Sequence, residues 1–233
     1  MGLFDFFKKQ NKTPEVKVSF SSNIYDDSEY YELLRERPMI DQFTGRPFDF
    51  PTYTDEYNTR TPYKLRELLL FVWWGNTKTG RKASVNIPKY FFNDYNLDGR
   101  MLTSSFITSE LLLEEKGKIK LTDKGQILFE EFYPLWEIHS VKNFPMNLDM
   151  DFPNWDKEEF DIKYYESMIR YYQAEATHSS KIIDYIKNHP DFDDIGNQEQ
   201  YHLSNRDSCL MKVKDFKEKL AILKRNKDGN YPI

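Results

Sequence analysis

The strongest constraint on the fold is a short segment in which two apolar stretches flank a charged turn. Residues 111–113 are all leucine, residues 114–118 are charged around Gly117, and Ile119 and Leu121 then alternate with Lys118 and Lys120. Side chains alternate between the two faces of a strand, so both aliphatic residues should face a core and both lysines should face outward. Glycine readily adopts the positive φ that a tight turn requires. The segment therefore predicts a β-hairpin whose tip contains Gly117.

Helical patterns flank this hairpin. Residues 62–74 (PYKLRELLLFVWW) carry large apolar side chains at helical spacing, and their length favours a helix over a buried strand. Thr61 followed by Pro62 is a typical helix start. Glu67 then lies too far along the helix to form a capping box with Thr61. A basic polar loop (75–84), a proline-started short helix (87–97) and a capped helix (98–112) precede the hairpin. An aromatic helix (125–138) follows it.

The phrase LLLEEKGKIKLTDKGQILFEE, residues 111–131, resembles the wing of bacterial winged helix-turn-helix proteins. MarR-like and PadR-like regulators are among them, and they often read L-x-E-x-x-G-K-x-x-L-T-x-K-G. The resemblance is confined mainly to residues 85–135, and the two helices before the hairpin match in pattern only. It implies a winged-helix unit within residues 58–140, with DNA contact by its third helix and the tip of its wing.

Nine side chains are the resulting candidates for nucleic-acid contact. The loop around residues 78–82 and the wing carry most of the positive charge, which suits phosphate contact. The third helix offers hydroxyl groups for phosphates and one arginine that can read guanine, opposed by Asp98 and Glu110. The candidates are Lys78, Arg81, Lys82, Arg100, Thr103, Ser104, Lys116, Lys118 and Lys120.

The rest of the chain divides around this unit. Residues 1–57 predict an N-terminal helix near 24–37 and an aromatic, proline-rich arm that wraps the core, and residues 141–154 predict a linker. Residues 155–233 predict a helical hairpin, with helices near 156–188 and 207–225. Such a hairpin cannot bury its apolar stripe alone, so it should dock on the winged unit or on a second copy. The amphipathic residues 1–22 fit either a short docked helix or a segment lying on a membrane surface.

The expected fold is therefore mainly α (α+β), with one β-hairpin and a C-terminal helical hairpin. The chain of 233 residues has a net charge of −5, which weighs against a protein whose main task is coating DNA. The charge is uneven, however. Residues 76–126 hold nine Lys/Arg against six Asp/Glu, while residues 137–200 hold six against fourteen. The basic segment permits a local nucleic-acid face.

The sequence lacks the motifs of several other kinds of functional site. The loop from Gly75 departs from a phosphate-binding P-loop, because Arg81 follows the second glycine and Ala83 takes the place of the hydroxyl residue. The four histidines show no metal-ligand spacing, and the acidic turn at residues 191–194 lacks the glycine and glutamate of an EF-hand. We therefore expect no metal, no cofactor and no catalytic activity.

Two main functions remain open at this point, with an enzyme of unrecognised type as a third and weaker candidate. The lone Cys209 excludes an internal disulfide, and no apolar run reaches 18 residues, so we expect a cytoplasmic protein with no membrane span. The first function is a bacterial DNA-associated or regulatory protein that binds DNA through the winged unit. The alternative is a protein-interaction or structural module with no nucleic-acid or catalytic role, whose C-terminal helices bind a partner or a second copy.

Overall fold

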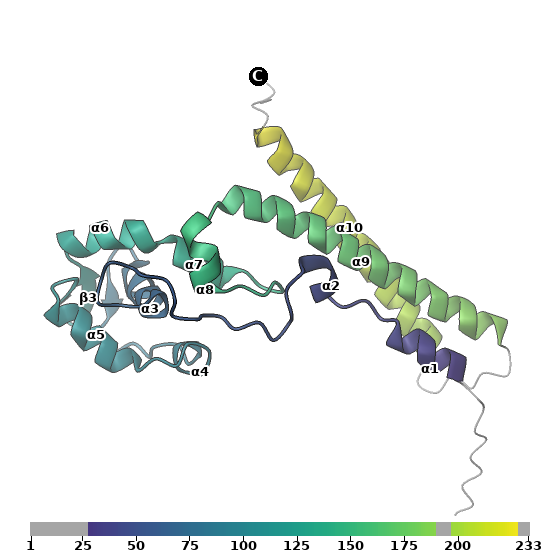
Figure 1. Cartoon of the computed structure of the whole chain (residues 1–233), viewed down its shortest axis with the longest axis horizontal. Helices are drawn as coiled ribbons and strands as arrows, with labels where there is room; N and C mark the ends of the chain where they lie inside the picture. Colours follow the sequence, from purple (N-terminus) through teal and green to yellow (C-terminus); the bar gives the residue numbers. More distant parts are fainter. Residues whose placement is uncertain (1–27, 190–196, 228–233) are drawn as a thin grey trace, which may run out of the picture.

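Helices dominate the computed structural model, which describes residues 28–189 and 197–227. Figure 1 shows a rounded group of short helices around a small sheet at one end and a long antiparallel pair of helices at the other. We call residues 51–155 the globular unit, and α9 with α10 the helical hairpin. Predictions for residues 1–22 and 191–194 lie outside the described residues. The elements are α1 (Ser28–Arg35), α2 (Asp41–Thr44), α3 (Leu65–Gly75), β1 (Arg81–Lys82), α4 (Tyr90–Asn93), α5 (Gly99–Thr108), β2 (Leu112–Glu115), β3 (Lys118–Leu121), α6 (Asp123–Phe132), α7 (Pro134–Ser140), α8 (Leu148–Asp151), the 3-10 turn η1 (Phe152–Asn154), α9 (Lys157–Asn188) and α10 (Gln198–Lys227).

The predicted β-hairpin is confirmed, and a third strand extends it. Strands β2 and β3 pair antiparallel, and Lys116 and Gly117 between them both have positive φ, at 51° and 72°. Two consecutive residues with positive φ make the tight turn whose twist matches that of the flanking strands. Strand β1 then pairs with the other edge of β3, which gives the order β1-β3-β2. A strand of two residues has too little periodicity to be predicted from sequence.

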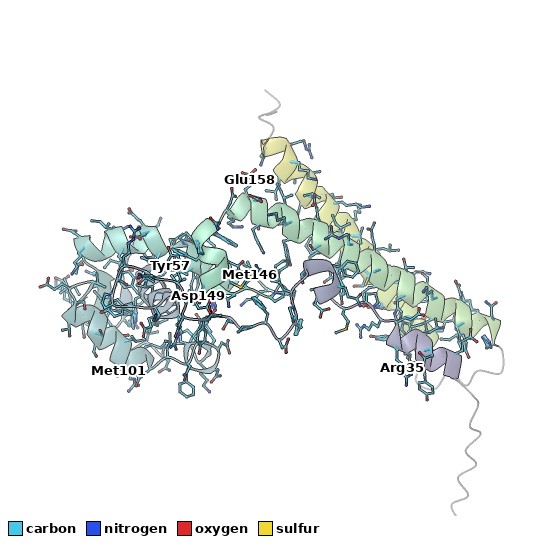
Figure 2. The ribbon with its side chains drawn as sticks, viewed as in Figure 1. Arg35, Tyr57, Met101, Met146, Asp149 and Glu158 are labelled. Atoms are coloured by element: carbon cyan, nitrogen blue, oxygen red, sulfur yellow. The ribbon has the colours of Figure 1, made fainter. Side chains whose placement is uncertain are left out.

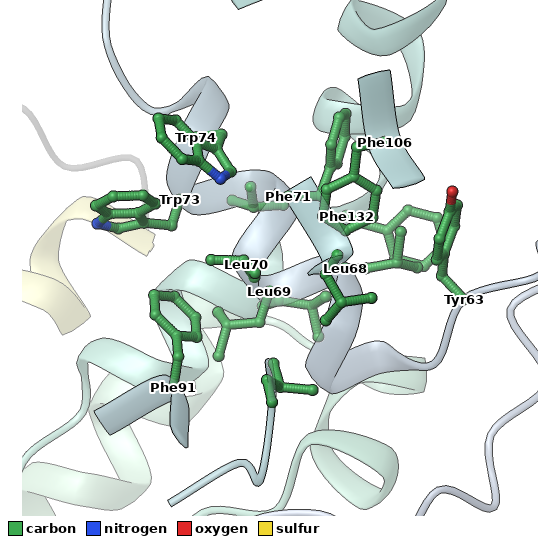
Figure 3. Packing of buried hydrophobic residues seen from close by; sticks show 14 of the residues in the cluster. Tyr63, Leu68, Leu69, Leu70, Phe71, Trp73, Trp74, Phe91, Phe106 and Phe132 are labelled. Carbon is green, nitrogen blue, oxygen red and sulfur yellow. The ribbon is translucent and has the colours of Figure 1, made fainter. Parts of the chain in front are cut away.

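The core of the globular unit is built around α3. Figure 3 shows its leucine, phenylalanine and tryptophan side chains surrounded by rings from neighbouring elements. Ile119 of the hairpin is buried in this cluster and Leu121 packs against it, as the alternation predicts. The buried set from α3 alone is Leu65, Leu68, Leu69, Leu70, Phe71, Val72, Trp73 and Trp74.

The start of α3 differs from the prediction. The helix begins at Leu65, and the Glu67 carboxylate accepts a 2.8 Å hydrogen bond from the backbone N–H of Lys64. Glu67 therefore caps the helix start, and the Thr61 hydroxyl instead accepts from the backbone N–H of Tyr63 at 3.1 Å. The expected aromatic helix at 125–138 is also two helices, α6 and α7, because Pro134 cannot donate a backbone hydrogen bond.

The segment expected to be a linker is part of the globular core. Leu148 is buried there, and the carboxylate of Asp149 accepts hydrogen bonds from the backbone N–H groups of Thr54, Asp55 and Tyr57 at 2.8–3.2 Å. Figure 2 shows Asp149 close to Tyr57 of the arm. Three donors on one carboxylate fix the arm against α8, so residues 141–154 belong to the globular unit. The arm wraps the core as predicted.

The helical hairpin joins the globular unit through aromatic contacts. The Phe160 ring of α9 packs on Trp155 and on Phe144, with ring centroids 5.0 and 5.2 Å apart. Helix α10 begins at Gln198, nine residues before the predicted start at 207. At the far end, Tyr30 of α1 packs with Ile182 and Ile186 of α9. The N-terminal segment thus covers part of the stripe that two helices cannot bury alone.

Candidate nucleic-acid interface

Helix α5 is held with one face in the core and the other in solvent. The carboxylate of Asp98 caps it, accepting from the backbone N–H groups of Arg100 and Met101 at 3.1 and 3.0 Å. Phe106 lies on the buried face, whereas Arg100 and Ser104 are exposed on the opposite one. Figure 2 places Met101 at the periphery of the globular unit. This exposed face is available to a partner.

Most of the predicted contact residues are accessible to solvent. Lys78, Lys82, Arg100, Ser104 and Lys116 are exposed. The hairpin lysines are partly engaged: Lys118 Nζ lies 3.5 Å from the Thr79 carbonyl oxygen, and Lys120 pairs with Glu115 at 3.1 Å. Surface ion pairs of this kind contribute little stability, so an incoming anion can displace them at low cost.

Arg81 is the first correction to the predicted set. Its Nε donates a 2.7 Å hydrogen bond to the Trp73 carbonyl oxygen, and its guanidinium carbon lies 4.2 Å from the centre of the Trp73 ring. Burial lowers the pKa of Arg81 below its ordinary value. The side chain therefore anchors β1 on α3, and neighbouring Lys82 is the exposed cation of this strand.

Thr103 is the second correction. The side chain is buried, and its hydroxyl accepts a 2.9 Å hydrogen bond from Trp74 Nε1 and donates one of 2.6 Å to the Gly99 carbonyl oxygen. A buried indole N–H needs such a partner, because an unsatisfied donor costs about 1–3 kcal/mol. Thr103 therefore joins α5 to α3. It contributes to the lining of the groove beside α5, but its hydroxyl is already engaged by two partners within the protein.

A groove of about 970 Å³ runs beside α5. Its lining is formed by residues 83–89, by residues of α4 and the start of α5, and by Trp74 and Ile119. Arg100 and Ser104 reach this groove, while Lys78 and the hairpin tip do not line it. Without Arg81 and Thr103, the seven remaining predicted residues fall into two groups: two α5 side chains on the groove, and five loop and hairpin lysines around the sheet.

Sequence reasoning missed two residues on the groove, Lys89 and Phe92. Both are exposed, whereas the neighbouring Phe91 is buried in the core. Phe91 and Phe92 are adjacent on a short helix, and no periodicity separates the ring that packs inward from the ring that faces solvent. The proline before Lys89, a typical helix start, was the available signal for a cation at the beginning of α4.

A half-buried histidine packs against α4 and does not line the groove. The Tyr95 hydroxyl is 2.8 Å from His139 Nδ1, and the Tyr90 and Trp136 rings pack on the imidazole. Burial, with a smaller contribution from the charge of Lys142, lowers the pKa of His139 to about 4. The imidazole is therefore neutral at pH 7. This packing gives His139 a structural role in the core.

No metal centre or membrane-spanning element stands out in the part of the chain that is described. Within residues 28–189 and 197–227, no group of three or more His, Cys, Asp or Glu side chains is arranged to hold a metal ion. In the same ranges, no helix combines the length and the apolar character needed to cross a bilayer. Comparison of the chain with family models, with curated proteins and with solved structures gave no match.

Proposed function

We propose that residues 58–140 form a winged-helix unit that binds duplex nucleic acid through the phosphates. The order of elements supports this: helix α3, strand β1, helices α4 and α5, then the β2–β3 hairpin. Pairing of β1 with β3 places β1 and the hairpin in one three-stranded sheet. Ile119 of this sheet lies in the same core as the side chains of α3. In this arrangement α5 is the recognition helix, and Arg100 and Ser104 are its exposed polar contacts.

The observation that carries the proposal is a pair of lysines on neighbouring strands. Lys82 of β1 lies directly opposite Lys118 of β3 in the antiparallel register. Like charges in that position repel each other, and Glu115, opposite Lys118 on the other neighbouring strand, offsets part of this repulsion. A phosphate between them would turn this repulsion into attraction on both sides. Lys116 at the exposed tip of the wing supplies a further cation for the adjacent backbone.

The test measures the affinity of the full chain for a fluorescein-labelled 20-base-pair duplex, by anisotropy, from 50 to 200 mM salt. Neutralising both lysines (Lys82→Gln with Lys118→Gln) should weaken binding about tenfold at the lowest salt. The slope of log K against log salt should become shallower by about 1.8, because two phosphate contacts are lost at about 0.9 each.

The matched control is Lys214→Gln with Lys217→Gln. Both of these lysines are exposed on α10, in the helical hairpin, so the control removes the same charge from another surface. Its affinity should stay within about twofold of the parent value, and its salt slope within about 0.3, because no phosphate contact is removed. Absence of duplex binding at 50 mM salt, or equal losses in both double variants, would rule out the wing as the binding surface.

A second candidate function is self-association through the outer face of α10. Leu210 and Ile222 are 50% and 53% exposed there, and they line a shallow groove of about 630 Å³ with Val213. A second copy packed on this face would complete the burial that a two-helix hairpin leaves unfinished. Sedimentation velocity across a hundredfold range of concentration tests it. A dimer that Leu210→Asp with Ile222→Asp converts to monomer supports this function, and a monomer at every concentration contradicts it.

A further inference from the structure

The most exposed aromatic ring of the globular unit stands on the rim of the groove beside α5. Phe92 is 69% exposed, whereas the adjacent Phe91 is 1% exposed and packs against the Trp73 and Tyr95 rings. Within the described residues, no other ring stacks on Phe92. Exposing a whole phenyl ring forgoes the free energy gained by burying it, which is about 2 kcal/mol or more for a side chain of this size. The position therefore calls for a ligand with an apolar face.

Two cations that line the same groove as this ring can bind an anionic ligand. Lys89 and Arg100 both line the groove and are exposed, and neither side chain has a carboxylate partner in the described part of the chain. The Asp98 carboxylate also lines the groove, and its Oδ1 accepts hydrogen bonds from the N–H groups at the start of α5. Glu114 is the remaining carboxylate, and it belongs to β2, on the sheet side.

The polar lining adds groups that can read the edge of a base. Asn86 and Asn93 both line the groove and are exposed, and each amide offers donors and an acceptor. An aromatic ring, flanking cations and side-chain amides together make up a stacking site for a nucleobase. A paired base inside a duplex cannot present its face to such a ring, whereas an unpaired base can.

We propose that this groove binds an unpaired nucleotide of a single-stranded nucleic acid, with the base on Phe92 and the flanking phosphates near Lys89 and Arg100. The proposal rests on the proposed nucleic-acid role of this unit and names a second ligand form for it. The wing holds duplex backbone, and the groove holds a single strand at a junction or an end. Glu114 directs the phosphates away from the sheet side of the groove, because two negative charges repel.

The experiment uses the full chain and two probes, a labelled 12-nucleotide single strand of mixed sequence and the 20-base-pair duplex, both at 50 mM salt. Phe92→Leu keeps an apolar side chain but removes the aromatic face. It should weaken single-strand binding about tenfold, within the range measured for removal of one stacking ring, and change duplex binding less than twofold. Phe92→Trp keeps an aromatic face, so this variant should bind the single strand with the parent affinity or more tightly.

The control is Phe48→Leu, because Phe48 is a 73% exposed ring on the arm, outside the residues that line the groove. Both substitutions lie at the surface, so both variants should keep the parent circular dichroism. Equal single-strand affinities for Phe92→Leu and Phe48→Leu would overturn the proposal and leave Phe92 as a contact for a protein partner.

The two probes separate this proposal from the wing proposal. Duplex binding that depends on Lys82 and Lys118, together with single-strand binding that ignores Phe92, would retain the wing and overturn the groove. Single-strand binding that depends on Phe92, without duplex binding, would retain the groove and overturn the wing.

Discussion

The globular unit and the helical hairpin are stabilised in different ways. The largest fully buried side chains, from Trp74 and Phe71 to Ile138, all belong to the globular unit. The hairpin buries fewer large apolar groups and also encloses Glu175, His178 and His202. Two of these polar groups find partners in the N-terminal segment. Arg37 Nε donates to the Glu175 carboxylate at 3.3 Å, and His178 Nε2 lies 2.7 Å from the Leu33 carbonyl oxygen.

Both regions bury polar groups that need partners, but the hairpin has fewer large buried apolar side chains beside them. Apolar burial is non-directional and grows with area, so the large apolar core supplies most of the stability of the globular unit. A buried carboxylate or imidazole loses its stabilisation once its partner moves, because an unsatisfied buried group is costly. The hairpin should therefore loosen when α1 detaches, while the globular unit stays folded. The four predictions that follow test this comparison, starting with the largest expected effect.

Phe71→Ala removes a fully buried ring at the centre of the globular unit. The expected cost is about 4 kcal/mol, the usual range for such a truncation in a packed core. Trp73, Trp74, Trp136 and Trp155 are the four tryptophans of the chain, and all lie in this unit. Urea unfolding followed by tryptophan fluorescence should shift strongly. Circular dichroism at 222 nm, to which the 62 residues of α9 and α10 contribute, should shift less. Coincident shifts would mean that the two regions unfold as one.

Ile182→Ala makes the reverse test in the hairpin. The side chain of Ile182, in α9, is fully buried and packs against Tyr30 of α1. Its truncation should therefore cost about 3 kcal/mol. Here the circular dichroism transition should move to lower urea, and the tryptophan fluorescence transition should stay within error of the parent. A fluorescence shift as large as that of Phe71→Ala would contradict the separation between the regions.

Acid should weaken the globular unit through His139. Its folded pKa of about 4 lies below the ordinary value of 6.5, so the unfolded chain binds the proton more tightly. The stability contributed by the neutral imidazole is complete above pH 6.5 and is lost as the pH falls towards 4. Allowing for partial exposure, the loss is about 2 kcal/mol.

The measurement compares fluorescence-detected unfolding at pH 7.5 and pH 4.5 for the parent and for His139→Gln. Other titrating groups contribute to both proteins, so the difference between the two pH slopes isolates His139. The parent should lose about 2 kcal/mol more than the variant over this interval. Parallel slopes would show that folding does not lower the pKa of His139.

The smallest effect is expected from the ion pair between Lys224 and Glu166, which joins α10 to α9 at 2.8 Å. Both side chains are largely exposed, so Lys224→Ala should cost less than about 1 kcal/mol and less still at high salt. The readout is the circular dichroism midpoint at 50 and 500 mM salt. A loss comparable to that of Ile182→Ala would show that the hairpin depends on charge pairs as well as on its buried groups.

Part of the candidate interface was predictable because its signals are local. The hairpin, its turn at Gly117 and the capped helix from residue 98 follow from alternation, glycine and an N-cap aspartate within a few residues. The roles of Arg81 and Lys82 were not predictable, because both are basic and adjacent in the sequence. Only the position of the Trp73 ring decides that one anchors the strand and the other faces solvent.

The linker at residues 141–154 shows the same limit. Its prolines, aspartates and asparagines are typical of a connecting segment, so the sequence predicts a linker there. The backbone donors of Thr54, Asp55 and Tyr57 lie more than ninety residues away along the chain, and they convert Asp149 into a structural anchor. No window of local sequence contains both sides of that interaction.

The sequence by itself determined the local elements: a mainly helical chain, one tight hairpin with Ile119 on the core face, and two long C-terminal helices. It did so because helix and strand periodicity reflect hydrogen bonding and side-chain direction over a few residues. The tertiary structure alone decided that β1 joins the sheet, that Thr103 is buried and that Phe92 is exposed. Each of these depends on which distant surfaces pack together, and that packing sets burial and partner choice for a single side chain.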